Sequence, residues 1–295
     1  MNTDPLPLLP DRAADAHKGD FGLALIVGGS RGMTGAVAMA GMAALRGGAG
    51  LVRLAVPDPC LETVAGFEPS YMTVPLPADD AGRIAGEAYD AIVELAEAAT
   101  VVGLGPGLGR SAELDRLVGR LYQTLARPMV IDADAINALA AQPELLAQPG
   151  GPRILTPHPG EFARLIGERL AADQRESVAV ELAARCGVVV VLKGHGTLIT
   201  DGKRQAKNET GNPGMATGGS GDVLTGLITA LACQDLAPFD AARLGVHLHG
   251  LAGDFAASEL GEVSMIASDL IEFLPDAFEE VRSWESDAET GGNQS

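Results

Sequence analysis

The stretch GGSGD, residues 218–222, combines the residue types that can hold a phosphoryl group beside a base. Glycines let a ligand approach the backbone, and the unpaired N–H groups of a first helical turn attract anions. An isolated Asp at a helix start often only caps the helix, but a carboxylate beside a transferring phosphoryl group accepts the proton of the attacking hydroxyl. We therefore predict an anion-binding helix start with Asp222 as the catalytic residue, built from Gly218, Gly219, Ser220 and Gly221.

A second helix start, TPHPGE at residues 156–161, combines His158 with Glu161. A zinc site would need further His or Cys ligands close by, and this stretch lacks them. Magnesium needs only one or two carboxylates together with phosphate oxygens and water, so Glu161 is a candidate magnesium ligand, directly or through water. The alternative is that Glu161 is an ordinary first-turn acid that complements the helix dipole. The sequence leaves both interpretations open.

The stretch LKGHGT, residues 192–197, offers a cation followed by open backbone. Lys193 is suited to contact a phosphate as a point charge. The residues after it are suited to line an adenosine ribose: Gly194, His195, Gly196 and Thr197. His195 taken alone is more typical of a surface turn than of a catalyst.

Three further turns carry small or polar residues. GLGPGLG at 103–109 is either a tight turn or a floor for a flat or phosphorylated ligand, and both interpretations stay open. GMTGA at 32–36 begins a helix and is a ligand candidate. VIDADAIN at 130–137 brings Asp132, Asp134 and Asn137, which either bind water or metal or satisfy turn amides.

Six short apolar runs bounded by Gly, Pro or Asp are typical of strands buried on both faces of a parallel sheet. They lie at 23–29, 50–57, 99–105, 128–134, 153–159 and 188–194. Helical patterns separate most of them, which predicts a doubly wound, three-layer α/β fold with the motifs at the carboxyl ends of the strands. The run from Val188 to Gly211 has no helical pattern between its two strand-like parts, so we expect an antiparallel hairpin at a sheet edge. We expect one domain over 1–295, with a core of about 17–280 and a flexible acidic C-terminal tail.

The composition excludes several classes of protein. A formal charge of −18 argues against binding to nucleic acid, which depends on clustered Lys and Arg. No run approaches the ~20 apolar residues of a membrane span, and the first twenty residues do not resemble a signal peptide. Three cysteines without CxxC spacing fit reduced, structural thiols. We expect a soluble cytoplasmic protein.

The combined motifs resemble those of the NAD(P)H-hydrate dehydratase family of the ribokinase-like superfamily. The resemblance extends from His17 to about Phe278 and rests on KGDFGLALIVGGSRGMTGA, GLGPGLG, DADAIN, TPHPGEFARL, LKGHGT and NPGMATGGSGDVLTG. It implies a three-layer α/β/α fold and the repair of hydrated cofactors. The S form of hydrated NADH or NADPH would be dehydrated with Mg²⁺ and ADP, or ATP, as co-substrate, and ADP would yield AMP and phosphate.

The resemblance also implies roles for individual residues. Ala36, Gly107 and His158 would contact the hydrate, and Asp222 would meet its reacting hydroxyl. The nucleotide would be held by Lys193, Gly194, His195, Gly196 and Thr197 with Gly221. Related kinases carry Asn-x-x-Glu near the metal, where this chain has His158-Pro-Gly-Glu161.

The family also suggests partners. A homotetramer is expected from the resemblance alone. Many members carry an amino-terminal epimerase domain, and about twenty residues precede the first expected strand, so we expect epimerisation to come from a separate protein. Two alternatives remain: an ATP-dependent kinase of a small vitamin-precursor alcohol, which would use the same Gly-Asp helix start, and a catalytically silent nucleotide-binding protein, for which an intact GGSGD would have no chemical purpose.

Overall fold

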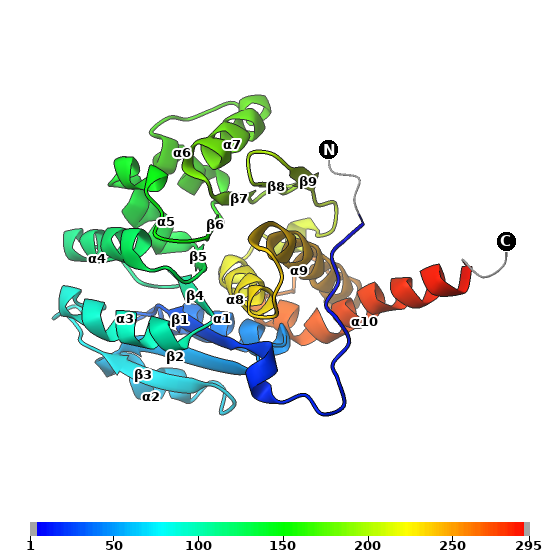
Figure 1. Ribbon diagram of the computed structural model, residues 1–295, viewed down its shortest axis with the longest axis horizontal. Coiled ribbons are helices and arrows are strands. Elements are labelled where there is room, and N and C mark those ends of the chain that lie inside the picture. The colour runs from blue at the N-terminus through cyan, green and yellow to red at the C-terminus, as the bar shows by residue number, and fades with distance from the viewer. Residues whose placement is uncertain (1–4, 292–295) are drawn as a thin grey trace.

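The computed structural model describes residues 5–291 of the protein (Figure 1). Its strands are β1 (Leu23–Val27), β2 (Leu51–Pro57), β3 (Met72–Leu76), β4 (Val101–Leu104), β5 (Met129–Ile131), β6 (Arg153–Leu155), β7 (Val189–Leu192), β8 (Leu198–Thr200) and β9 (Gln205–Lys207). Within the described chain they form one nine-stranded sheet in the order β3-β2-β1-β4-β5-β6-β7-β8-β9. Strands β1 to β7 are parallel, and β8 and β9 pair antiparallel. The predicted mostly parallel α/β sheet with an antiparallel hairpin is confirmed.

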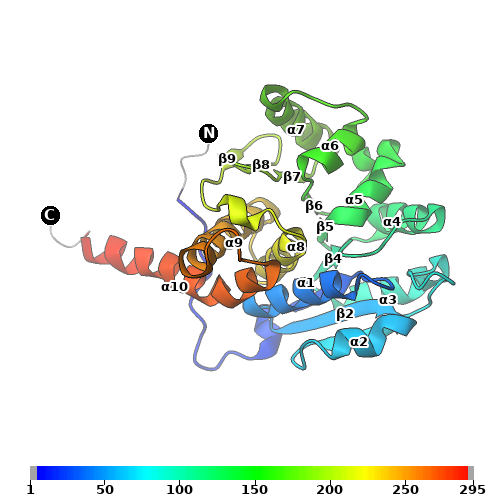
Figure 2. The ribbon, with the colours of Figure 1, turned by 180° about the vertical axis from the view of Figure 1, so that it is seen from behind.

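Helices cover both faces of this sheet. The α-helices are α1 (Thr34–Arg46), α2 (Leu61–Ala65), α3 (Tyr89–Ala98), α4 (Ala112–Thr124), α5 (Ala133–Ala140), α6 (Pro159–Ile166), α7 (Ala172–Cys186), α8 (Ser220–Ala232), α9 (Pro238–Leu260) and α10 (Ala267–Gly291). Short 3-10 helices lie at η1 (Lys18–Phe21), η2 (Asp58–Cys60), η3 (Gly86–Ala88), η4 (Pro143–Ala147) and η5 (Pro213–Met215). Figures 1 and 2 show α3 to α7 on one side of the sheet and α1, α8 and α9 on the other. This is the expected three-layer arrangement.

The central strands are apolar along their whole length because both of their faces are covered. All residues of β4, β5 and β7 are buried, and their side chains divide between two hydrophobic clusters, one on each face. A third cluster joins α8, α9 and α10 on the outer side of the second face. The two faces therefore hold the strands rigidly, with their carboxyl ends along one rim.

At both edges of the sheet, the structure has a strand that the sequence did not predict. Strand β3 was not predicted, because its sequence MTVPL contains Pro75 and leaves Met72 exposed, as an edge strand can. Strand β9 adds a third antiparallel strand where only a hairpin was expected.

Both ends of the described chain are more ordered in the fold than the sequence predicted. Near the amino end, Leu6, Leu8 and Leu9 pack against the outer cluster of α8, α9 and α10, so the packed region begins before residue 17. Helix α10 continues to Gly291 through most of the segment expected to be a flexible tail, because Glu and Ala support helix. Residues 292–295 of that segment lie outside the described residues. Among residues 5–291, no helix combines the length and apolar character that a bilayer crossing demands.

Candidate active site

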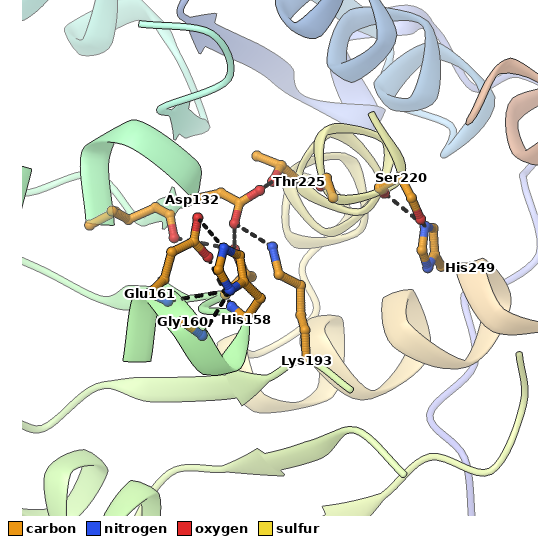
Figure 3. A network of polar contacts seen from close by, with 11 residues as sticks. Asp132, His158, Gly160, Glu161, Lys193, Ser220, Thr225 and His249 are labelled. Carbon is orange, nitrogen blue, oxygen red and sulfur yellow. Dashed lines mark hydrogen bonds and ion pairs between the residues drawn. The ribbon is translucent and has the colours of Figure 1, made fainter. Parts of the chain in front are cut away.

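Asp132 is the centre of a buried polar network at the carboxyl end of β5 (Figure 3). Its side chain is 1% exposed. Oδ1 accepts hydrogen bonds from Lys193 Nζ at 2.7 Å and from Thr156 Oγ1 at 2.7 Å. Oδ2 accepts from Thr225 Oγ1 at 2.8 Å. These contacts join the ends of β5, β6 and β7 to the second turn of α8.

Lys193 follows β7 directly and points into this network. Burial lowers the pKa of its ammonium, but the negative charges of Asp132 and Glu161 together raise that pKa above its ordinary value. The side chain is 20% exposed, so the ammonium stays charged at the edge of the site. Such a cation is available to an incoming phosphate from its exposed side, although its direct partner here is a carboxylate.

Asp222 lies in the first turn of α8 and does not cap it. The N-cap residue is Gly219, with φ +98°, and no side-chain hydrogen bond caps this helix. Over residues 5–291, we find no hydrogen bond or ion pair to the Asp222 carboxylate, so Asp222 provides no capping bond, although as a first-turn acid it still complements the helix dipole. Burial, followed by the negative charge of Asp132, raises the pKa of Asp222 to about 7. The carboxylate is therefore unengaged and has the proton affinity of a general base near neutral pH.

The backbone of the α8 start is open to a ligand. A Cβ built on Gly218 would meet nothing within 4 Å. A Cβ on Gly221 would lie 3.0 Å from Lys193 Nζ and 3.4 Å from Asp132 Oδ2. Gly221 thus passes directly over the ion pair. Because first-turn amides have no intrahelical partners, this surface presents N–H groups to an anion.

His158 and Glu161 form a capping box at the start of α6. The Nδ1 atom of His158 accepts from the Gly160 amide at 2.9 Å, and Glu161 Oε2 accepts from the His158 amide at 2.8 Å. The structure thus confirms that Glu161 has a first-turn role. Burial raises the pKa of Glu161 to about 7, whereas burial and then Lys193 lower the pKa of His158. Half of the His158 side chain is exposed, so the neutral ring remains accessible to a substrate.

The two small residues predicted to contact substrate lie together. A Cβ on Gly107 would be 3.0 Å from the Cβ of Ala36 and 2.6 Å from the Met33 carbonyl oxygen. Gly107 has φ +63°, and its carbonyl accepts from Ser30 Oγ at 2.8 Å. The tight-turn interpretation of GLGPGLG is therefore confirmed, and its role as a ligand floor stays a prediction.

The loop after Lys193 is stabilised from within. Thr197 Oγ1 donates to the Gly194 carbonyl at 3.0 Å. Cβ atoms on Gly194 and Gly196 would meet nothing within 4 Å, so these backbone faces are uncovered. For His195 we find no hydrogen bond or ion pair in the described part of the chain. The loop has the open backbone that the predicted nucleotide contact requires.

Comparison with known proteins assigns the family. The sequence profile of the NAD(P)H-hydrate dehydratase family matches residues 24–276. The chain belongs to this family. The bifunctional NAD(P)H-hydrate repair enzyme Nnr of Moorella thermoacetica is 46% identical over 286 residues, which cover 96% of this chain and 53% of the relative. This dehydratase-family chain therefore spans about half the length of the curated relatives that it matches.

Solved structures agree with the family and with the ribokinase-like fold. The ADP/ATP-dependent NAD(P)H-hydrate dehydratase of Bacillus subtilis, co-crystallised with ATP and Mg²⁺, is 30% identical, with a TM-score of 0.79. The match covers 93% of this chain and 95% of that chain. A ribokinase-like superfamily protein of Enterococcus faecalis is 26% identical with a TM-score of 0.77, covering 93% of this chain and 92% of the other.

Few protein oxygens at this site are free to bind magnesium. Among the described residues, no group of three His, Cys, Asp or Glu side chains could hold a metal. Asp132 already accepts hydrogen bonds from Lys193 and two threonines, and one Glu161 oxygen accepts the His158 amide. These residues fit a magnesium ion that is carried mainly by nucleotide oxygens and water. Glu161 remains the candidate protein ligand.

The roles of three residues of the site could not be predicted from the sequence. It noted Asp132 but not its ion pair, whereas Asp134 does satisfy a turn amide, accepting from Gly109 N at 2.9 Å. Thr225 and His249 were not singled out at all. Both lie inside helices of mostly apolar sequence, α8 and α9, where a single polar residue gives no local signal.

Proposed function

We propose that this protein dehydrates the S form of hydrated NADH and NADPH, restoring the reduced cofactor while ADP is converted to AMP and phosphate. One observation carries the proposal: Asp222 is a half-buried carboxylate with a pKa of about 7 in the first turn of α8, a helix start that no side chain caps. Family membership and the similarity to the Bacillus subtilis enzyme supply the substrate class.

The chemistry needs a better leaving group than hydroxide. Asp222 accepts the proton of the ring hydroxyl. The hydroxyl oxygen attacks the terminal phosphoryl group of ADP, and AMP leaves. The lone pair of the ring nitrogen then expels phosphate, and loss of a proton from the adjacent ring carbon restores the dihydronicotinamide. Asp222 thus acts at the reacting oxygen.

The other residues bind and orient the reactants. The amides of Gly219 and Gly221 would face the transferring phosphoryl group, and the Lys193 ammonium would add a fixed positive charge at the same place. Magnesium, when bound with the nucleotide, would neutralise phosphate charge and polarise the phosphoryl oxygens, with Glu161 as its protein ligand. Gly194, His195, Gly196 and Thr197 would hold the nucleotide, and Ala36, Gly107 and His158 would hold the nicotinamide end.

The resemblance supports the cellular setting of the proposal. We propose a homotetramer that works in the cytoplasm, with a separate NAD(P)H-hydrate epimerase converting the R form to the S form. Light scattering on the purified protein tests the first part. Supplying an R and S mixture with and without an added epimerase tests the second, because only the S fraction should be consumed by this protein alone.

The deciding experiment mixes the protein with hydrated NADH or NADPH, Mg²⁺ and either ADP or ATP. We expect reduced-nicotinamide absorbance to return in step with phosphate release, faster with ADP. No recovery with either nucleotide contradicts the proposal. Incubation with ATP and small vitamin-precursor alcohols covers the kinase alternative, in which a phosphorylated product would accumulate without free phosphate. Asp222→Asn is the matched inactive control.

A further inference from the structure

Helix α9 contacts both ends of the loop that leads into the α8 start. At the near end, Asp254 Oδ2 accepts from the Gly211 amide at 2.8 Å, and Oδ1 accepts from Asn212 Nδ2 at 3.0 Å. Thr210 Oγ1 donates to the His247 carbonyl at 2.9 Å. These bonds fix where the loop begins.

Glycines on α9 permit this close approach. A Cβ on Gly250 would collide with Thr210, and a Cβ on Gly253 would collide with Met215. The Thr210 backbone and the Met215 side chain therefore lie directly on the helix. A surface this close transmits its geometry to the loop instead of leaving the loop free to adjust.

At the far end, His249 reaches the first residue of α8 (Figure 3). Its Nε2 lies 2.9 Å from the Ser220 carbonyl oxygen and 3.4 Å from Ser220 Oγ. His249 is 8% exposed, and burial is the main cause that lowers its pKa, to about 4. The ring is therefore neutral at neutral pH. Because a carbonyl oxygen only accepts, Nε2 carries the ring proton and donates it to Ser220.

The bond to the Ser220 carbonyl also determines the direction of the next amide in the chain. A peptide group is planar, so the direction of the Ser220 carbonyl fixes the opposite direction of the Gly221 N–H. That N–H belongs to the first turn of α8, and its residue lies beside the Lys193–Asp132 pair, since a Cβ built on Gly221 would be 3.0 Å from Lys193 Nζ. The phosphoryl group is proposed to bind at this place.

We propose that His249 is a positioning residue, which orients the Ser220–Gly221 peptide so that the Gly221 N–H points at the transferring phosphoryl group. The role in turnover rests on the proposed function, whereas the effect on anion binding does not. His249 has no need to touch substrate, and its action passes entirely through the Ser220 carbonyl.

The test compares His249→Gln with His249→Leu in the full chain. Glutamine places an N–H donor near the position of Nε2, whereas leucine fills the space without a donor. Misdirecting one such donor is expected to lower kcat by about 10- to 100-fold in the leucine variant, and to weaken binding of ADP with Mg²⁺ in a calorimetric titration. The glutamine variant should retain most of the wild-type kcat and most of the wild-type affinity for ADP.

Leu248→Ala provides the matched control for a purely structural effect. Leu248 is fully buried, neighbours His249 on α9 and belongs to the outer hydrophobic cluster. The Leu248→Ala substitution should lower the melting temperature at least as much as His249→Leu does. Below its own melting temperature, the Leu248→Ala variant should bind ADP with unchanged affinity. The proposal is overturned if Leu248→Ala weakens ADP binding as much as His249→Leu, or if His249→Gln shows no recovery.

Failure of the proposed function gives a different result. Wild-type protein that binds ADP but dehydrates no hydrate contradicts the proposed reaction, and the ADP titrations still decide the role of His249. Wild-type protein that binds neither ADP nor ATP overturns both.

Discussion

The Lys193 ammonium lies 2.7 Å from Asp132 Oδ1, directly beneath the backbone of Gly221. Two opposite effects on Asp222 come from this one pair, since the charge of Asp132 raises the pKa of Asp222 and the charge of Lys193 lowers it. Burial is the largest cause of the raised pKa, ahead of the charge of Asp132. The pair therefore supplies a cation for phosphate while leaving the neighbouring carboxylate basic.

Replacing Asp132 by Asn should disturb both functions of the pair. Without the negative charge, the pKa of Asp222 falls, so the pH midpoint of kcat/KM should move below that of the wild type. Lys193 also loses its buried partner, and the loss of such a partner costs about 3 kcal/mol of stability. A pH–rate profile and a urea melt measure the two effects.

Asp134→Asn is the control for this change. It lies in the same strand-to-helix turn, but its carboxylate accepts from the Gly109 amide instead of from Lys193. The charge of Asp134 also raises the pKa of Asp222, but by less than the charge of Asp132, so the midpoint should fall by less in this variant than in Asp132→Asn. An unshifted midpoint in Asp132→Asn would refute the electrostatic role.

Gly221 should tolerate no side chain. The Cβ atom of an introduced residue would lie 3.0 Å from Lys193 Nζ, and valine would add two further carbons over the site where the anion binds. Gly221→Val should weaken nucleotide binding by about 100-fold or more, with a smaller loss for Gly221→Ala. Calorimetric titration with ADP and Mg²⁺ checks the order. Equal affinities for wild type and the valine variant would contradict phosphate binding at this backbone.

Glu161→Gln separates the two roles proposed for Glu161. Glutamine preserves a capping box, so the start of α6 should remain folded and the melting temperature should not fall. A neutral amide is a poorer magnesium ligand than a carboxylate, so the Mg²⁺ concentration needed for half-maximal nucleotide binding should rise several-fold. An unchanged Mg²⁺ requirement would leave Glu161 with the helix cap alone.

The central sheet was predictable because its physics is local. A strand covered on both faces is mostly apolar, and the six predicted runs all correspond to strands of the structure. The edge strand β3 lacks this constraint, since half of its surface can face water, and a proline at Pro75 further obscures it.

The same distinction holds within the site. GGSGD could be interpreted from the sequence because its glycines, its helix start and its carboxylate are adjacent in the chain. Asp132 and Lys193 are 61 residues apart, and Ser220 and His249 are 29 apart. Such pairs arise only when the topology brings strand ends and helices together, so no local pattern identifies them.

Asp222→Asn should abolish turnover and yet stabilise the protein at high pH. The folded-state pKa of Asp222 is about 7, above its ordinary value of 3.8, chiefly because of burial. A raised pKa means that the protonated form stabilises the fold below about pH 4, and that this contribution is lost as pH rises through 7. Above pH 7 the wild type holds a half-buried carboxylate at a free-energy cost, whereas asparagine resembles the protonated form and carries no charge.

The melting temperatures of the two proteins should therefore coincide near pH 4 and separate as pH rises to 8. Because Asp222 is only partly shielded from water, we expect a gain of about 2 kcal/mol in the variant, or roughly 5 °C. Asp58→Asn, a change at an exposed first-turn acid of η2, should show no such divergence. A difference in melting temperature that is independent of pH would mean that Asp222 is not a buried base, because a merely structural defect has no reason to follow the titration of one carboxyl group.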